Sequence, residues 1–173
     1  MKRVCIALAL AAVIWAAPGF KRAALVPLEK SFDDRITHIA DDPYILVGFT
    51  RGIYLEGYGA VFTAEVNLAI GPAQSPFRPV ITKDDLLRIR SKKFDRLPVL
   101  REAMRRTLLD AATALEEVPA KEQIAVGVSL AYRPDEDMSG MPAQILMQGE
   151  RGKLIDAKLK RVSLDTVVKV REF

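Results

Sequence analysis

The chain has 173 residues, of which 50% are hydrophobic and 28% are charged, a composition that excludes a disordered protein and fits one globular domain. Its formal net charge is +4. Without Lys2 and Arg3, which belong to the N-terminal segment, 24 basic residues stand against 22 acidic ones, so the charge gives no support for nucleic acid as a partner.

The N-terminus has the pattern of a signal peptide. Lys2 and Arg3 precede an apolar stretch over residues 4–17, and a positive start followed by a short hydrophobic run is typical of an export signal. Cleavage after Gly19 would place small residues where processing requires them, whereas an uncleaved segment would remain as a membrane anchor. We therefore predict that residues 1–19 are a signal peptide or a membrane anchor.

Export determines where the rest of the chain would act. We expect residues 27–173 to form a single extracytoplasmic α+β domain, periplasmic or secreted, that meets the membrane only through the N-terminal segment. Cys5, the only cysteine, lies within that segment. A processed chain would therefore form no disulfide and would carry no thiolate nucleophile.

The first predicted element of this domain is a helix. Pro27 and Glu29 stand near its start, where a fixed φ and a negative charge are both favourable. Pro43 ends the helix, because the residue before a proline avoids the helical region. The apolar residues that recur at helical spacing are Leu28, Phe32, Ile36 and Ile39.

A β-hairpin follows, and it is the most strongly patterned stretch of the chain. Over residues 60–70 every second residue is apolar, which predicts a strand whose buried face packs against the long helix described next. Gly57 and Gly59 precede this strand and allow a tight turn. The nearly unbroken apolar run over residues 44–49 suits a strand that is covered on both faces, and residues 44–55 fit either one bent strand or two short ones.

A long helix is predicted after a loop over residues 71–79. Thr82 is a candidate N-cap, and the helical pattern continues to Val118. Pro98 interrupts the pattern, which allows either a kink or two separate helices. The apolar positions step by three or four residues and predict one buried face, made of Leu97, Leu100, Met104, Leu108, Ala111 and Leu115.

The last third of the chain is predicted to contain three strands and a short helix. Residues 124–132 alternate large apolar residues with small ones, and we expect the small side to lie close to a helix. Residues 144–148 form a second strand, which could pair with the first as a hairpin. A short helix over residues 153–160 and a strand over residues 164–170 complete the domain.

This order predicts an α+β fold, with a mainly antiparallel sheet of about five or six strands and a long helix packed on one face, preceded by an N-terminal apolar leader helix. Hairpins on both sides of the long helix favour the antiparallel arrangement. The alternative is a mixed sheet, in which the strand after the long helix runs parallel to its predecessor through a right-handed crossover.

Polar side chains on the two arms of the hairpin form the candidate binding site for a ligand or a partner. With the turn at the two glycines, these side chains gather on or near one face. The competing interpretation is that the tyrosines are amphipathic edge residues and the strand glutamate is a solvated position. The candidate residues are Arg51, Tyr54, Glu56, Tyr58 and Glu65.

The residue patterns give little support for catalysis, a cofactor or a metal. His38 is the only histidine, so no pair of histidines could hold zinc. A histidine beside a carboxylate could act as a general base, which leaves a secreted hydrolase using carboxylates or His38 as the alternative function. We expect no catalytic residues, no cofactor and no metal site.

The stretch IYLEGYGAVFTAEV over residues 53–66, followed by a long charged helix, resembles uncharacterised exported bacterial proteins in which a Tyr-Gly-x-x-Phe strand follows an apolar leader. The resemblance covers the middle third of the chain. It implies export and a bacterial source, and it implies no particular activity. With the leader, it favours a non-catalytic extracytoplasmic domain that binds a protein or a ligand at the cell envelope, with an envelope protein as one candidate partner.

Overall fold

The computed structural model describes residues 20–38, 45–71 and 81–173. The predicted leader over residues 1–19 lies outside these ranges, so its helix and its cleavage stay predictions. The described elements, in chain order, are η1 (Arg22–Ala24), α1 (Val26–Thr37), β1 (Ile45–Leu55), β2 (Gly59–Asn67), α2 (Lys83–Ala114), β3 (Gln123–Leu130), β4 (Gln144–Glu150), α3 (Arg151–Lys158), α4 (Leu164–Val167) and β5 (Lys169–Glu172).

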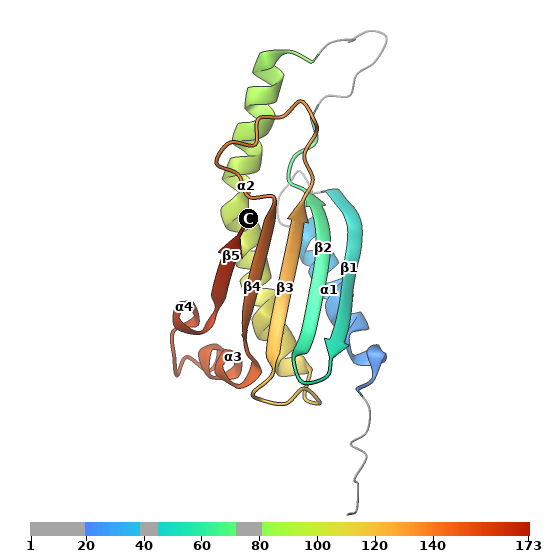
Figure 1. Cartoon of the computed structure of the whole chain (residues 1–173), viewed down its shortest axis with the longest axis vertical. Coiled ribbons are helices and arrows are strands. Elements are labelled where there is room, and N and C mark those ends of the chain that lie inside the picture. The colour runs from blue at the N-terminus through green and yellow to red at the C-terminus, as the bar shows by residue number, and fades with distance from the viewer. Residues whose placement is uncertain (1–19, 39–44, 72–80) are drawn as a thin grey trace, which may run out of the picture.

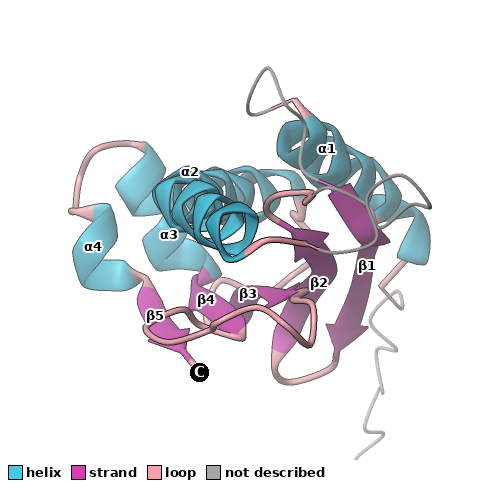
Figure 2. Ribbon diagram, turned by 90° about the horizontal axis from the view of Figure 1, so that it is seen from above, coloured by secondary structure: helices cyan, strands magenta, loops and turns pink. Residues whose placement is uncertain are grey.

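A five-stranded sheet in the spatial order β1-β2-β3-β4-β5 forms one layer of the fold. Neighbouring strands are antiparallel except β2 and β3, which are parallel. Parallel neighbours need a crossover connection, and α2 supplies it by crossing one face of the sheet. The longer helices α1 and α2 both lie on this face (Figure 1 and Figure 2). The α+β prediction is confirmed, and one strand pair is parallel, as in the mixed-sheet alternative.

The hydrophobic core lies between the sheet and α2. Phe62 and Val66 of β2 and Val126 of β3 are fully buried, and they belong to one cluster with all six predicted apolar positions of the long helix. Full burial of a side chain of this size contributes about 1.5–3 kcal/mol. The predicted contact between the alternating strand and the long helix is therefore confirmed. Ile70 is an exception, because it follows the end of β2 and is 59% exposed.

The helix α2 is one continuous element. The Thr82 hydroxyl accepts the Asp85 N–H, and the Asp85 carboxylate accepts the Thr82 N–H, so this capping box satisfies amide groups that a helix start leaves unpaired. The helix passes through Pro98 without ending, so the alternative of two helices is wrong. The N-terminal part of α2 extends past the ends of the strands (Figure 1).

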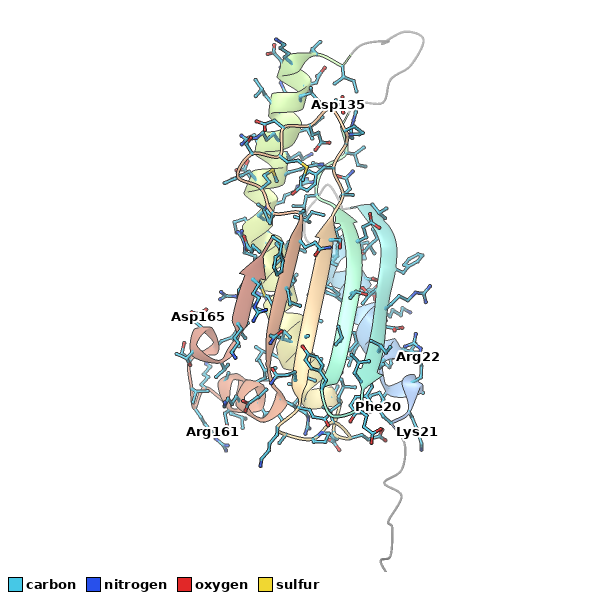
Figure 3. All side chains as sticks on the ribbon, viewed as in Figure 1. Phe20, Lys21, Arg22, Asp135, Arg161 and Asp165 are labelled. Atoms are coloured by element: carbon cyan, nitrogen blue, oxygen red, sulfur yellow. The ribbon has the colours of Figure 1, made fainter. Side chains whose placement is uncertain are left out.

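The loop between β3 and β4 packs beside this protruding part of α2, where Figure 3 labels Asp135. Lys93 of α2 donates to Glu136 of the loop at 2.6 Å, and both side chains are 5% exposed or less. The Lys93 ammonium group also lies 4.7 Å from the centroid of the Tyr132 ring. Burial, together with the Glu136 charge, raises the pKa of Tyr132 to about 12. Because an unpaired buried charge is costly, this ion pair holds the loop on the helix.

Two expectations for the last third of the chain are wrong. In β3 the large residues Val126 and Val128 are buried with the helices, and Gly127 faces the other side, because burial of the larger side chains removes more apolar surface from water. Residues 164–170 are not one strand. The start of this stretch forms the short helix α4. Ser163 precedes the helix and Asp165 lies in its first turn, and both residue types favour a helix start. The predicted hairpin of β3 and β4 is confirmed.

Gly59→Ala should destabilise the domain far more than Gly57→Ala. Both glycines have positive φ, +128° and +78° respectively, and alanine is strained at both by about 1–2 kcal/mol. A Cβ at Gly59 would also overlap the Gln123 carbonyl oxygen, whereas a Cβ at Gly57 would meet nothing within 4 Å. In urea unfolding we expect Gly59→Ala to lose about 4 kcal/mol or more. Equal losses at the two positions would contradict this close approach of β2 and β3.

Removal of one partner of the buried ion pair should cost more than removal of both. Lys93→Met leaves the Glu136 carboxylate buried without its cation, and we expect a loss of about 3–5 kcal/mol in urea unfolding. Adding Glu136→Leu removes the orphaned charge, so the double variant should be the more stable of the two. The exposed neighbour gives the matched control, since Lys92→Met should change stability by less than about 1 kcal/mol. A double variant that is less stable than Lys93→Met would rule out this interpretation.

Candidate functional site

The side of the sheet opposite α1 and α2, called the open face below, holds the candidate site. Successive side chains of a strand point to opposite sides, so residues that alternate with the buried positions lie on the open face. The pairing of Arg51 with Thr63 fixes this assignment for β1 and β2. The open face includes Arg51, Ile53, Leu55, Val61, Thr63, Glu65, Gln123, Ala125, Gly127, Ser129, Gln144, Leu146, Gln148, Glu150, Lys169 and Arg171.

The edge strand β1 exposes a row of large apolar side chains, which sequence reasoning missed. Its pairing with β2 contains two register shifts, and each bulge inserts a residue that has no direct partner. Val47 and Phe49 are exposed, so the expectation that residues 44–49 are covered on both faces is wrong for the described part of this run. Over residues 45–55 the alternative of one bent strand, predicted from Gly48 and Gly52, is confirmed, and the alternative of two short strands is wrong. The row, between 44% and 71% exposed, is Val47, Phe49, Ile53 and Leu55.

Two of the predicted site residues, Arg51 and Glu65, lie together on the open face. They line a depression of about 250 Å³, which the exposed Phe49 ring also borders. The depression thus combines one basic, one acidic and one aromatic side chain. These are the kinds of group that contact a partner with mixed apolar and charged chemistry. The remaining lining residues are Gly48, Thr63, Ala64 and Ser129.

Tyr54 turns to the helix side of the sheet instead. Its ring stacks on Phe20 with centroids 4.3 Å apart, and its hydroxyl donates to Glu122 at 2.9 Å. Burial, together with this bond to a carboxylate, raises the pKa of Tyr54. Tyr54 therefore anchors the first described residue of the chain and does not join Arg51 and Glu65.

Glu56 and Tyr58 lie in the turn between β1 and β2, at one end of the sheet. Both are exposed, and the Tyr58 hydroxyl makes a long bond of 3.5 Å to the Gln148 side chain of the open face. The five predicted residues thus occupy three places: Arg51 and Glu65 lie on the open face, Tyr54 lies on the helix side, and Glu56 and Tyr58 lie in the turn.

The helix α1 closes the outer edge of β1. Glu29 and Asp33, one helical turn apart, accept the backbone N–H groups of Gly52 at 2.6 Å and Thr50 at 2.9 Å. Arg22 pairs with Glu29 at 2.7 Å and donates to the Gly52 carbonyl oxygen at 3.1 Å. These side chains take the places that a neighbouring strand would occupy. The edge is therefore closed to strand pairing at Thr50 and Gly52.

The ionised form of Glu29 is favoured at this edge. The side chain is buried, and burial alone would raise the pKa of its carboxyl. The hydrogen bonds from Arg22 and from the Gly52 amide, with the charges of Arg22 and Arg51, outweigh burial and hold the pKa of Glu29 below its usual value. A charged carboxylate accepts such bonds more strongly than a neutral group does.

His38 lies at the end of α1, on the helix side of the sheet, with its Nδ1 2.7 Å from the Asp34 carbonyl oxygen. Glu65 lies on the open face, on the other side of the sheet, so the two do not form one site. Of the other charged groups nearby, Arg35 is bonded to Asp110, and Arg106 pairs with Glu102. The cavity at His38, of about 360 Å³, contains no serine, threonine or cysteine nucleophile among its lining residues Arg35, Val99, Glu102, Ala103 and Arg106.

Within the three described ranges, no group of three or more histidine, cysteine, aspartate or glutamate residues could hold a metal ion. In the same part of the chain, no helix combines the length and the apolar character that a membrane span requires.

Comparison of the chain with protein-family models, with curated proteins and with solved structures found no match. The resemblance to exported bacterial proteins stays a prediction. Its Tyr-Gly-x-x-Phe residues have structural roles here: Tyr58 belongs to the hairpin turn, Gly59 allows the close approach to β3, and Phe62 is fully buried.

Glu29→Gln should lower the free energy of unfolding by about 1–2 kcal/mol at neutral pH, because the amide loses the charge that attracts Arg22 and the Gly52 N–H. The pKa of Glu29 is lowered on folding from its ordinary value of 4.5. Its contribution is therefore complete above about pH 4.5 and is lost as the pH falls through the folded-state value.

Urea unfolding from about pH 7 down to about pH 3 should show the wild type and Glu29→Gln converging in stability. The exposed Glu116→Gln is the matched control and should change stability by less than about 0.5 kcal/mol at every pH. A difference between wild type and Glu29→Gln that does not depend on pH would show that the charge is not what matters.

Proposed function

We propose that this chain is a non-catalytic, extracytoplasmic binding domain that contacts a protein partner at the cell envelope through the open face of its sheet. The observation that carries the proposal is the row of exposed apolar side chains on β1 beside Arg51 and Glu65. Neighbouring exposed apolar side chains mark interaction surfaces on soluble domains. Charges of both signs beside such a row would select the partner and its orientation.

A protein partner fits this surface better than a small ligand does. The depression beside Phe49 measures about 250 Å³, and a second one beside Gly127 and Phe173 measures about 200 Å³. Small-molecule sites usually have volumes of about 300–1,000 Å³, so neither depression is large enough to enclose a typical ligand. The five neighbouring strands, each about 4.8 Å from the next, together form a broad surface. Such a surface suits the extended contact that two proteins make.

The alternative function, a secreted hydrolase using carboxylates or His38, has less support. Among the described residues that line the His38 cavity, the one carboxylate is that of Glu102, which is paired with Arg106. Burial would raise the pKa of Asp110, but bonds from Arg35 and Lys158 hold it below its usual value. A general acid or base works best with a pKa near the working pH. The pKa of the Asp110 carboxyl is lowered, which moves it away from neutral pH.

The export part of the proposal is supported by the leader pattern and by Phe20. Cleavage after Gly19 would make Phe20 the new N-terminal residue, and its ring packs on Tyr54. A processed chain would then begin with a residue that already belongs to the folded domain. A retained segment over residues 4–17 would instead hold the same domain at a membrane.

A photo-crosslinking residue in place of Phe49 or Ile53 should form an adduct with one specific protein in the envelope fraction of intact cells, because both side chains are exposed beside the proposed site. Arg51→Glu should reduce the adduct yield from both positions by about two- to fivefold, since it reverses a charge beside the contact. The same probe at Lys30, exposed on α1, is the control and should give no adduct. Equal labelling from Lys30, no adduct from the two β1 positions, or adducts confined to the cytoplasmic fraction would contradict the proposal.

A further inference from the structure

The two edges of the sheet are built differently. At Thr50 and Gly52 the edge of β1 is closed by side chains of α1 and η1. At the other edge, no strand of the described residues lies beyond β5, and all four of its residues are exposed. Figure 1 and Figure 2 show β5 at the side of the sheet away from α1. A further strand therefore has room to pair with β5.

The register with β4 shows which backbone groups of β5 point outward. Phe173 donates its N–H to the Gln144 carbonyl oxygen at 3.0 Å, and its own carbonyl oxygen accepts the Gln144 N–H at 3.2 Å, so the two form a hydrogen-bonded pair. Such pairs alternate with non-bonded ones along an antiparallel ladder. The residues two and four positions before Phe173 therefore bond to β4, and the N–H and C=O groups of Val170 and Glu172 point away from the sheet.

The side chains along this edge are basic on the open face. Lys169 and Arg171 stand opposite Gln148 and Leu146 of β4, so neither cation faces a carboxylate across the ladder. On the helix side, Val170 is 42% exposed. Because cross-strand neighbours interact directly, a strand added at this edge would meet a cation, an apolar side chain and a second cation in succession.

The charged groups on the helix side of the same edge are already paired. Arg101 of α2 donates to both carboxylate oxygens of Glu172, at 2.7 and 2.9 Å. Arg105 pairs with Asp165 of α4 at 2.8 Å, and Figure 3 shows Asp165 at the β5 side of the molecule. The charge that an added strand would meet therefore comes chiefly from the two cations on the open face.

We propose that the outer edge of β5 binds an extended acidic segment of a partner protein, which pairs with β5 as a sixth strand. Acidic residues two positions apart on that segment would face Lys169 and Arg171, and the apolar residue between them would pack beside Val170. A second copy of this chain is unsuited to the edge, because pairing β5 with itself would bring like charges together. This site is independent of the proposed contact at β1, which lies at the opposite edge of the sheet.

The test uses the purified full-length chain and a fluorescein-labelled peptide with the core Glu-Val-Glu-Val-Glu. Fluorescence anisotropy should show saturable binding, and a peptide with lysine in place of glutamate should bind at least about tenfold more weakly. Residue-level hydrogen exchange gives the direct readout. Bound peptide should slow exchange of the Val170 and Glu172 amides and leave Arg171, already bonded to β4, nearly unchanged.

Three variants separate strand pairing from general charge attraction. Lys169→Glu with Arg171→Glu should weaken binding by about tenfold or more, because two attractions between opposite charges become repulsions. Lys30→Glu with Lys121→Glu makes the same change of net charge elsewhere on the exposed surface and should alter affinity by less than about twofold. Val170→Pro removes an outward N–H without removing a bond to β4, and it should abolish the exchange protection.

Several outcomes would overturn the proposal. These are no binding at about millimolar peptide, binding that Val170→Pro leaves unchanged, an equal loss in the Lys30 and Lys121 control, or protection at amides other than those of Val170 and Glu172. Urea unfolding shows which variants are folded. If Val170→Pro does not fold, the affinity of the Lys169→Glu, Arg171→Glu variant tests the proposal. Adducts from β1 combined with no peptide binding would support the proposed function and reject this edge site.

Discussion

The fold depends on the contact between one amphipathic helix and one side of a sheet. Met104 and Leu108 of α2 and Phe62 of β2 are all fully buried in one cluster, where a period of three to four residues meets a period of two. The large apolar side chains of β2 and β3 are drawn to this side. The other side is left with small and polar residues such as Thr63 and Gly127, and the open face follows from the same pattern that builds the core.

The elements with strong periodicity could be predicted because the spacing of their apolar residues shows directly which side is buried. This holds for α2 and for the alternating strand β2, and Thr82 marked the helix start by its own chemistry. Prediction from the sequence fails where the burial of a residue depends on which element packs against it. An apolar run such as residues 44–49 does not tell whether a second layer covers it, and alternation in β3 tells which residues share a face but not which face meets the helix.

The candidate site was predictable in the same partial way. Arg51 and Tyr54 are an odd number of residues apart on one strand, so the period of two alone would have separated them. The roles of Glu29 and Asp33 could not be read from the sequence. Two acidic residues one turn apart on a helix look like a solvated surface, and their partners are backbone groups of a strand some twenty residues further along. Only the tertiary arrangement brings them together.

The attachment of the first described residues sets a direction for the whole molecule. Phe20 stacks on Tyr54, and the Lys21 amide lies 3.4 Å from a Glu117 carboxylate oxygen, so the chain enters the domain at the end near the β1–β2 turn, far from the loop that carries Asp135 (Figure 3). The start of α2 lies at the opposite end of the described domain (Figure 1). At 1.5 Å per residue, a helix of 32 residues is about 48 Å long. The helix α2 therefore separates the end where the chain enters the described domain from the end that carries Asp135 (Figure 3).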